Sequence, residues 1–203
     1  MTTDDAALFS VIGAQRACRS FGAEPVSDGD LDRMLDAAVH APSAENRQPW
    51  EFVVVRDADA RTAIGELIAR AWDTVGRDFS RDRLAPRLLA DVDQGATGGI
   101  ARAPVHIVVG ADTERGLEMT ASASIFPAVQ NLMLAAGALG LGTALTTIAL
   151  GYADELRAIV GFPDSVRPMA VIPVGHPARP LGPPRRESFA TRTHRDRYGN
   201  RWA

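Results

Sequence analysis

The chain has 203 residues, and its 46% hydrophobic and 23% charged residues are typical of one globular domain of ordinary size. Its net charge of −3 argues against nucleic acid as a partner. A lone cysteine excludes an intramolecular disulfide framework, and no apolar stretch is long and uninterrupted enough to span a membrane. The acidic N-terminus does not resemble a secretory signal, so we expect a cytoplasmic protein.

Helices and strands alternate in the first half of the chain. Ser27 is a favourable N-cap, and the helix that begins there should end before Pro42, because proline disfavours helical geometry in the preceding residue. A β-branched strand is predicted over residues 51–55. Two charged helical stretches follow near residues 58–76 and 81–93, and the Arg-, Asp- and Gly-rich breaks around them are typical of a mobile lid.

The second half of the chain predicts the remainder of a single α+β domain. Strands are predicted over residues 105–109, 143–149 and 169–174, and helices over 121–139 and 152–160. The tail, residues 177–203, is rich in proline and arginine and has almost no apolar periodicity. Such a tail cannot supply its own core, so we expect it to lie along another surface, that of a partner subunit.

The densest signal for chemistry is the segment Ala41–Trp50, which reads APSAENRQPW and joins a predicted helix to a predicted strand. Prolines fix its backbone, and the side-chain amides of Asn46 and Gln48 each offer a donor and an acceptor. This combination suits the edge of a planar heterocycle with mixed donors and acceptors. The alternative is a turn whose polar groups cap the preceding helix.

Two arginines near the N-terminus form a second signal. Arg16 and Arg19 are three residues apart and would share one face of a helix. Two guanidinium groups in that position can hold a phosphate and an electron-rich ring edge together. The alternative is a pair of solvated surface arginines.

Other patterns in the sequence do not support a site. The sequence GALGLG at residues 137–142 ends a helix, whereas a dinucleotide-binding fingerprint follows a strand and opens a helix. The histidines lack the spacing of metal ligands, so no metal is expected. Cys18 lies beside two arginines but has no catalytic partner pattern, and core packing is the better interpretation of it.

Segments spread along the chain resemble the FMN-dependent nitroreductase family. Ala41–Trp50 and the apolar strand after it match the family string A-P-S-x-x-N-x-Q-P-W completely. Further segments resemble the family's R-x-x-R-x-F element (16–21), central dimer-forming helix (124–136), terminal strand (171–177) and closing D-R-Y-G (196–199). The resemblance is weakest between residues 56 and 102, where the substrate side of the pocket should form.

This resemblance implies an α+β, nitroreductase-like fold with a mixed central sheet flanked by helices, in an intertwined homodimer. It implies FMN at the subunit interface, where each site takes residues from both chains and the tail wraps around the partner. The implied reaction is ping-pong: NAD(P)H reduces FMN and leaves, and a small organic acceptor, such as a nitroaromatic or a quinone, then takes the electrons.

The resemblance also assigns residues to the FMN phosphate. Arg16, together with Arg185 or Arg186 from the tail, would bind the phosphate. Two departures from the family pattern affect this end of the site, because Gln15 stands where many relatives have a second arginine and Ala17 stands where they have a serine. Arg185 and Arg186 could supply the missing contact, and the alternative for either is a solvated basic tail.

Other residues are assigned to the flavin ring and the ribityl chain. Arg19 would lie near N1 and O2 of the ring, and Thr146 or Thr147 would lie near N5. The residues implied to hold the ribityl chain and the pyrimidine edge share one loop: Pro42, Ser43, Asn46 and Gln48. No side chain needs to act as an acid or base, so no catalytic residue is assigned.

Three alternatives remain open from the sequence. The same scaffold could perform reductive dehalogenation or oxidative flavin cleavage, a choice that the lid residues would decide. The protein could instead bind or sequester a flavin without catalysis. It could also be a scaffold protein with no cofactor.

Overall fold

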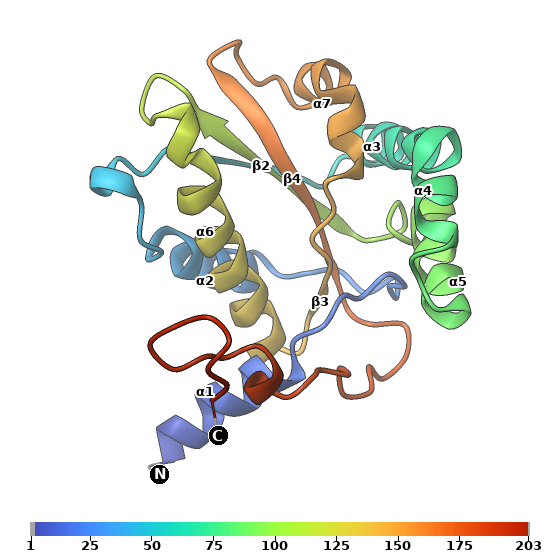
Figure 1. Ribbon diagram of the computed structural model, residues 1–203. Helices are drawn as coiled ribbons and strands as arrows, with labels where there is room; N and C mark the ends of the chain where they lie inside the picture. Colours follow the sequence, from blue (N-terminus) through green and yellow to red (C-terminus); the bar gives the residue numbers. More distant parts are fainter. Residues whose placement is uncertain (1–2, 203) are drawn as a thin grey trace.

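Four strands are found in the central sheet of the structure, a computed structural model that describes residues 3–202 (Figure 1). They are β1 (Trp50–Val55), β2 (Val105–Asp112), β3 (Gly142–Thr143) and β4 (Val166–Gly175), in the order β1-β2-β4-β3 across the sheet. These neighbouring strands pair antiparallel. A parallel bridge between Ala17 and Thr143 places the N-terminal segment beside β3 and gives the sheet its mixed character.

Helices cover both faces of the sheet (Figure 1). The sheet therefore separates two hydrophobic cores, one on each face. Ile107 and Val109 of β2 pack with α2 (Asp28–Val39) and α6 (Glu118–Ala138). Val108 lies between them in sequence and packs on the opposite face, because successive side chains of a strand alternate. That second core is built with α3 (Ala58–Ala71) and α7 (Ala153–Val160). Burial on both faces explains the continuous apolar sequences of β2 and β4, and the predicted α+β class is confirmed.

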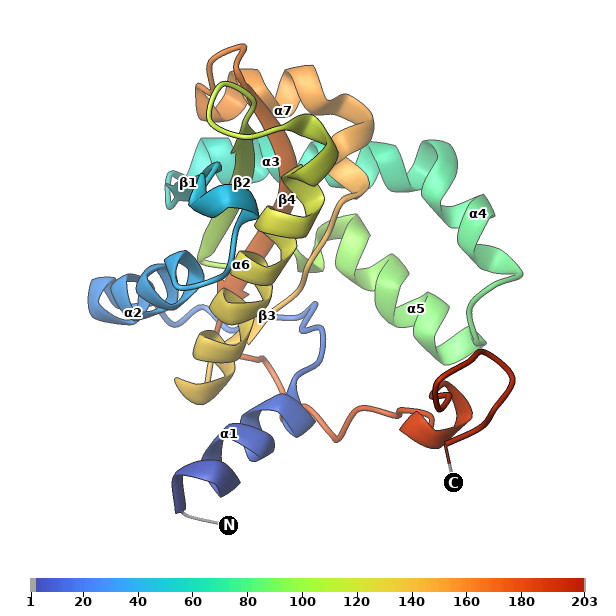
Figure 2. The same ribbon diagram turned by 60° about the vertical axis from the view of Figure 1, so that its left-hand side comes forward.

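The remaining α-helices lie outside these layers. They are α1 (Thr3–Ala14), α4 (Arg77–Arg81) and α5 (Pro86–Gln94). α1 extends away from the body of the molecule, whereas α4 and α5 form a helical hairpin on the side away from α2 (Figures 1 and 2). Among residues 3–202, no helix combines the length and the apolar character needed to cross a bilayer.

The start of α2 follows its sequence signal. The hydroxyl of Ser27 accepts a hydrogen bond from the backbone amide of Asp30 at 3.1 Å, which satisfies one of the unpaired donors of the first turn. The helix ends at Val39, before Pro42, as predicted. The end of α2 at Val39 fixes where the helix meets the loop that carries the APSAENRQPW sequence.

The strand predicted over residues 143–149 is wrong. Strand pairing stops at Thr143, apart from an isolated bridge between Thr146 and Val171, and the chain then forms a 3₁₀ helix, η4 (Ile148–Tyr152). The reason is tertiary: Ala149 is fully buried in the second core beside α3. The chain leaves the sheet to reach that core, so an apolar sequence of suitable length does not continue as a strand.

Two π-helical turns connect the hairpin to the body. They are η2 (Trp72–Gly76), between α3 and α4, and η3 (Gly95–Gly99), which follows α5. The helix predicted over residues 58–76 is therefore interrupted at Trp72. Such turns leave backbone hydrogen bonding irregular and are frequent at functional sites.

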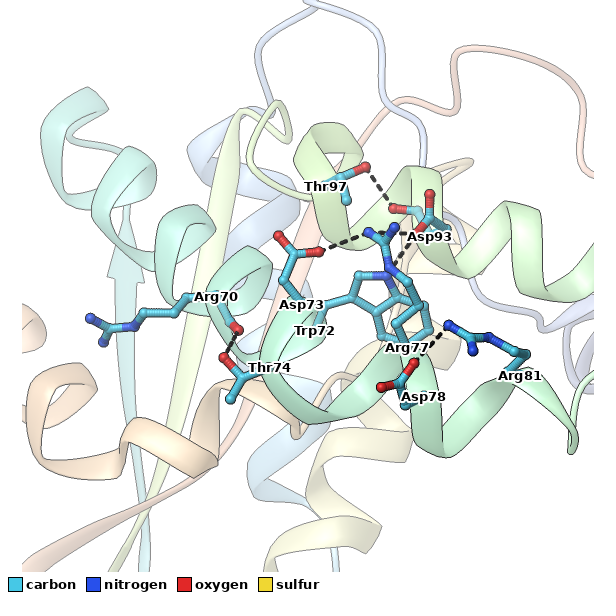
Figure 3. Close-up of polar contacts among 9 residues, drawn as sticks. All are labelled: Arg70, Trp72, Asp73, Thr74, Arg77, Asp78, Arg81, Asp93 and Thr97. Atoms are coloured by element: carbon cyan, nitrogen blue, oxygen red, sulfur yellow. Dashed lines mark hydrogen bonds and ion pairs between the residues drawn. The ribbon is translucent and has the colours of Figure 1, made fainter.

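A polar cluster joins the two ends of the hairpin (Figure 3). Trp72 Nε1 donates a hydrogen bond to Asp93 Oδ1 at 2.8 Å. Arg77 pairs with the same Asp93 oxygen at 2.9 Å and with Asp73 at 2.8 Å. We call these four residues the hairpin latch. It connects η2 and α4 to α5 through one shared carboxylate oxygen.

Within the described residues, the C-terminal tail contacts the body through its first part, residues 177–182. Phe21 and Pro177 form an isolated bridge, and the amide of Ala178 donates to the carbonyl of Ser20 at 3.0 Å. Among the described residues, none from 178 onward belongs to a hydrophobic core. A short 3₁₀ helix, η5 (Phe189–Thr191), lies within the tail. Its wrapping around a partner stays a prediction.

Candidate functional site

Arginine side chains from three segments gather around a hollow of about 190 Å³. Arg16 and Arg19 come from the N-terminal segment, Arg87 comes from α5, and Arg179 comes from the segment after β4. We call this hollow the arginine pocket and include Asp91 of α5, which also lines it. Guanidinium groups bind phosphate through charge-assisted and often bidentate hydrogen bonds. The donor set therefore fits a phosphate group.

Arg16 connects the arginine pocket to a second hollow of about 210 Å³. Its Nη1 donates to the carbonyl of Gly182 at 2.7 Å, which joins the two ends of the chain. The second hollow is lined largely by apolar groups, among them Met133 and Gly137 from the last turns of α6. The second hollow and the arginine pocket therefore share the cation of Arg16. This arrangement suits a ligand that has both an apolar ring and a phosphate.

Asp91 pairs with two of the arginines. Its Oδ2 lies 2.8 Å from Arg19 Nη1, and its Oδ1 lies 3.5 Å from Arg179 Nη2. The Arg19 and Asp91 side chains are 23% and 30% exposed, whereas that of Arg179 is 69% exposed. The Arg19–Asp91 pair is thus a partly buried, short contact, and the Arg179 contact is a looser surface pair.

The sequence prediction found only part of this cluster. Arg16 and Arg19 both line the pocket, but the prediction that they share one face of a helix is wrong, because α1 ends at Ala14 and the segment after it pairs with Thr143 of β3 through Ala17. Arg87 and Arg179 were not predicted. Arg179 could have been found from its position directly after the terminal strand; no sequence signal places Arg87. Arg185 and Arg186 are exposed and lie outside the lining of both hollows, and Arg186 Nη1 donates to the carbonyl of Arg185 at 3.0 Å. Their role at the phosphate stays a prediction.

The loop between α2 and β1 presents the predicted heterocycle-binding residues. Ser43 Oγ accepts a hydrogen bond from the amide of Gln48 at 3.0 Å, and Asn46 Oδ1 accepts from Gln48 Nε2 at 3.1 Å. Glu45, Asn46 and Gln48 have φ angles of 54°, 54° and 50°. Left-handed conformations in such residues are strained, and strain of this kind concentrates at binding sites. Pro42, Asn46 and Gln48 are exposed, so their side chains are accessible to a ligand.

This loop and the second hollow lie at opposite ends of α6. The amide of Ala44 donates to Ser124 Oγ in the second turn of α6 at 3.1 Å. Gly137, which lines the second hollow beside Arg16, is thirteen residues further along the same helix, about 20 Å at the rise of an α-helix. One chain therefore does not bring the two predicted halves of the site together.

The threonines after β3 are held by the backbone. Thr146 exchanges two backbone hydrogen bonds with Val171, at 3.1 and 2.9 Å, and its side chain is half-buried. Thr147 is exposed at the start of η4. Ala17, which lines the arginine pocket, pairs with Thr143 next to this segment. The contact fixes the pocket relative to the sheet.

Two buried residues with titratable side chains, Cys18 and His106, are not catalytic candidates. Burial raises the pKa of the Cys18 thiol, and its Sγ donates to the carbonyl of Ser20 at 3.3 Å, so this cysteine is not an activated nucleophile. Burial lowers the pKa of His106 to about 4, and its Nε2 lies 2.9 Å from the carbonyl of Ile100. Neutral His106 is therefore the donor in that contact and packs as a core residue. Within the described residues, no cluster of His, Cys, Asp and Glu could hold a metal ion.

Comparison with known sequences identifies relatives across most of the chain. The model of the nitroreductase family matches residues 12–176. A NADH dehydrogenase from Thermus thermophilus is 30% identical over 81% of this chain and 83% of its own. A putative NADH dehydrogenase/NAD(P)H nitroreductase from Archaeoglobus fulgidus is 28% identical, over 82% of this chain and 83% of its own. Iodotyrosine deiodinase 1 from Rattus norvegicus is also 28% identical, but the match covers 62% of its length.

Solved structures show the same fold. A nitroreductase from Desulfitobacterium hafniense with bound FMN superposes with a TM-score of 0.76, at 23% identity, over 97% of this chain and all of the other. An iodotyrosine deiodinase bound to FMN and 3-iodo-L-tyrosine superposes with a TM-score of 0.73, at 26% identity, over 95% and 99% of the two chains. With a family match that spans most of its length, this chain belongs to the nitroreductase family.

Proposed function

We propose that this protein binds FMN and transfers electrons from NADH or NADPH to a small organic acceptor, such as a nitroaromatic or a quinone. The observation that carries the proposal is the arginine pocket beside an apolar hollow, a pair of features that fits a phosphorylated ring cofactor. Relatives named NADH dehydrogenase and FMN reductase [NAD(P)H] support the same chemistry. The protein is an FMN-dependent NAD(P)H oxidoreductase.

The phosphate end of the cofactor is assigned to Arg16 and Arg179. Both line the arginine pocket, and Arg16 is held in place by its hydrogen bond to Gly182. Arg185 or Arg186 adds a further cation from the tail. Arg19 lies near N1 and O2 of the ring, where its charge offsets the negative charge of the reduced cofactor.

The ring end is completed by a second copy of the chain. The loop that carries Ser43, Asn46 and Gln48 contacts α6 about 20 Å along the helix from the second hollow, which lies beside Arg16. We therefore assign these residues to the pocket of the partner subunit. Exposed apolar side chains on α1 support a homodimer: Leu8, Phe9 and Ile12 are 57%, 59% and 47% exposed. The tail adds further exposed aromatic residues for the same interface.

The bound flavin supplies the redox chemistry, because it accepts a hydride from the nicotinamide and returns electrons to the acceptor in a ping-pong sequence. The chain's own residues bind and tune it. Thr146 or Thr147 offers a hydrogen-bond donor near N5. Since no side chain is required as an acid or base, no catalytic residue is assigned.

A second reaction deserves a direct comparison, because iodotyrosine deiodinases are among the relatives. Reductive dehalogenation would use the same cofactor and differ in the residues that contact the acceptor. These residues lie in the region of α3, α4 and α5, where the family resemblance is weakest. The identity of the acceptor therefore depends on the residues of that region.

The proposal is tested with purified protein loaded with FMN. Stopped-flow mixing with NADH and with NADPH should bleach the flavin absorbance, and subsequent mixing with a nitroaromatic or a quinone should restore it. A flavin that neither nucleotide reduces would point to a non-catalytic binding protein. Reoxidation by a halophenol, but not by a nitroaromatic or a quinone, would replace the proposed acceptor with a halogenated one.

A further inference from the structure

We propose that Asp91 is a positioning residue of the cofactor site, which orients Arg19 and lowers the net positive charge that the bound flavin experiences. The inference rests on the proposed function, because it takes FMN as the ligand of the arginine pocket. Asp91 belongs to α5, in the region where the family resemblance is weakest, and no sequence motif pointed to it.

The first support is the way Asp91 holds Arg19. The contact between Asp91 Oδ2 and Arg19 Nη1 is 2.8 Å long and partly buried. A guanidinium group has five N–H donors, so this single contact restrains the Nη1 end of the group and leaves other donors for a ligand. A carboxylate on a guanidinium restricts a long side chain that would otherwise sample many rotamers.

The second support is a stripe of residues that packs along Arg19. Asp91, Gly95 and Gly99 follow one another at intervals of four, from the end of α5 into η3, where Gly98 with a φ of 145° departs from helical geometry. A Cβ atom at Gly95 would lie 2.8 Å from Arg19 Cδ, and one at Gly99 would lie 2.3 Å from the carbonyl oxygen of Arg19. The stripe thus contacts the guanidinium, the aliphatic stem and the backbone of one arginine. Glycine is required where the backbones approach so closely.

The third support is the charge of the pocket. Among the described residues that line it, Arg16, Arg19, Arg87 and Arg179 are opposed by the carboxylate of Asp91 alone. A phosphate monoester carries close to two negative charges at neutral pH, and a reduced, anionic flavin adds another. With Asp91 in place, the four arginines leave a net charge of +3 on this lining. Removal of the carboxylate should therefore favour the reduced, more negative form of the cofactor.

The experiment measures the reduction potential of the bound flavin by equilibration with a reference dye. The variants are Asp91→Asn, which removes the charge but keeps an oxygen that can accept from Arg19, and Asp91→Ala, which removes both. The matched control is Asp82→Asn, the same change at an exposed position just after α4. Thermal unfolding without FMN checks that each variant folds.

Asp91→Asn should shift the equilibrium between oxidised and reduced flavin about tenfold toward the reduced form, about 30 mV for a two-electron couple. Asp91→Ala should also bind FMN about tenfold more weakly than Asp91→Asn, because Arg19 is no longer oriented. If Asp91→Asn shifts the potential no more than Asp82→Asn does, Asp91 has no tuning role, although the proposed function stands. If the wild-type chain binds no FMN, both the function and this inference are overturned.

Discussion

The hydroxyl of Ser124 accepts a hydrogen bond from the backbone amide of Ala44 at 3.1 Å and donates to the carbonyl of Thr120. This buried contact fixes the APSAENRQPW loop to the first turns of α6. The second hollow, which shares Arg16 with the arginine pocket, lies at the opposite end of the same helix. In the proposed homodimer, each chain carries two half-sites, and α6 sets the distance between them.

Ser124→Ala tests the anchor of the loop. The variant leaves the amide of Ala44 without its acceptor, which should cost about 1 kcal/mol of unfolding free energy. FMN binding should weaken as well, because the loop is no longer held in its left-handed conformation. Urea unfolding and FMN titration check both effects. Ser122→Ala, at an exposed position of the same helix, should change neither, and equal behaviour of the two variants would contradict the anchoring role.

Mixed dimers test whether each site is shared between two chains. One chain carries Arg16→Ala and Arg19→Ala, and the other carries Asn46→Ala and Gln48→Ala. Each variant alone should bind FMN poorly. After the two are unfolded and refolded together, every mixed dimer should regain one intact site, because one pocket then combines the intact arginines with the intact loop. FMN stoichiometry measures the result, and no recovery in verified mixed dimers would place the whole site within one chain.

His106 predicts a pH dependence of stability. Its pKa in the folded protein is lowered to about 4 from 6.5, so the unfolded chain binds more protons between these values. The stabilisation from neutral His106 is fully present above pH 6.5 and is lost as the pH falls toward 4, by about 3 kcal/mol in all. Urea unfolding at several pH values measures it.

His106→Gln is the matched variant for that measurement. Its amide can still donate to the carbonyl of Ile100 but does not titrate. The difference in unfolding free energy between the wild type and His106→Gln should shrink or reverse in favour of the variant as the pH falls below 6.5. Parallel pH profiles for the two proteins would show that His106 does not carry this dependence.

The hairpin latch predicts a local effect on α4 and α5. Trp72→Phe keeps an aromatic ring in the second core but removes the Nε1 donor to Asp93. We expect a loss of about 1–2 kcal/mol in stability, with faster hydrogen exchange concentrated in α5. Trp202→Phe in the tail is the control. If the amides of α5 exchange no faster in Trp72→Phe than in Trp202→Phe, the latch does not hold the hairpin.

The sequence predicted the fold correctly where a local signal, such as a helix cap or an apolar strand, determines the structure. Ser27 placed the start of α2, and the apolar sequence of residues 105–109 placed β2. The strand at residues 143–149 was wrong because Ala149 is drawn into a core formed with α3, a contact between segments far apart in the chain. Periodicity within a segment carries no information about such a contact.

The residues of the candidate site also differ in whether the sequence could predict them. Arg16 and Arg19 belong to one short segment after α1, so their proximity follows from closeness in sequence, although the helical spacing predicted for them is absent. Arg179 and Asp91 reach the same pocket from the end of β4 and from α5, and only the folded chain brings them together. The homodimer, and with it the place of Arg185 and Arg186, depends on a second chain and stays a prediction.

The central claim is that the arginine pocket holds the phosphate of FMN, and the most direct measurement compares the binding of FMN and riboflavin by fluorescence titration. We predict one FMN per chain, bound about ten- to a hundredfold more tightly than riboflavin, the range expected for charge-assisted hydrogen bonds to phosphate. Arg16→Ala should lose most of this preference, whereas Arg33→Ala, at an exposed position on α2, should keep it. Equal affinity for the two flavins, or no binding of either, would contradict the account.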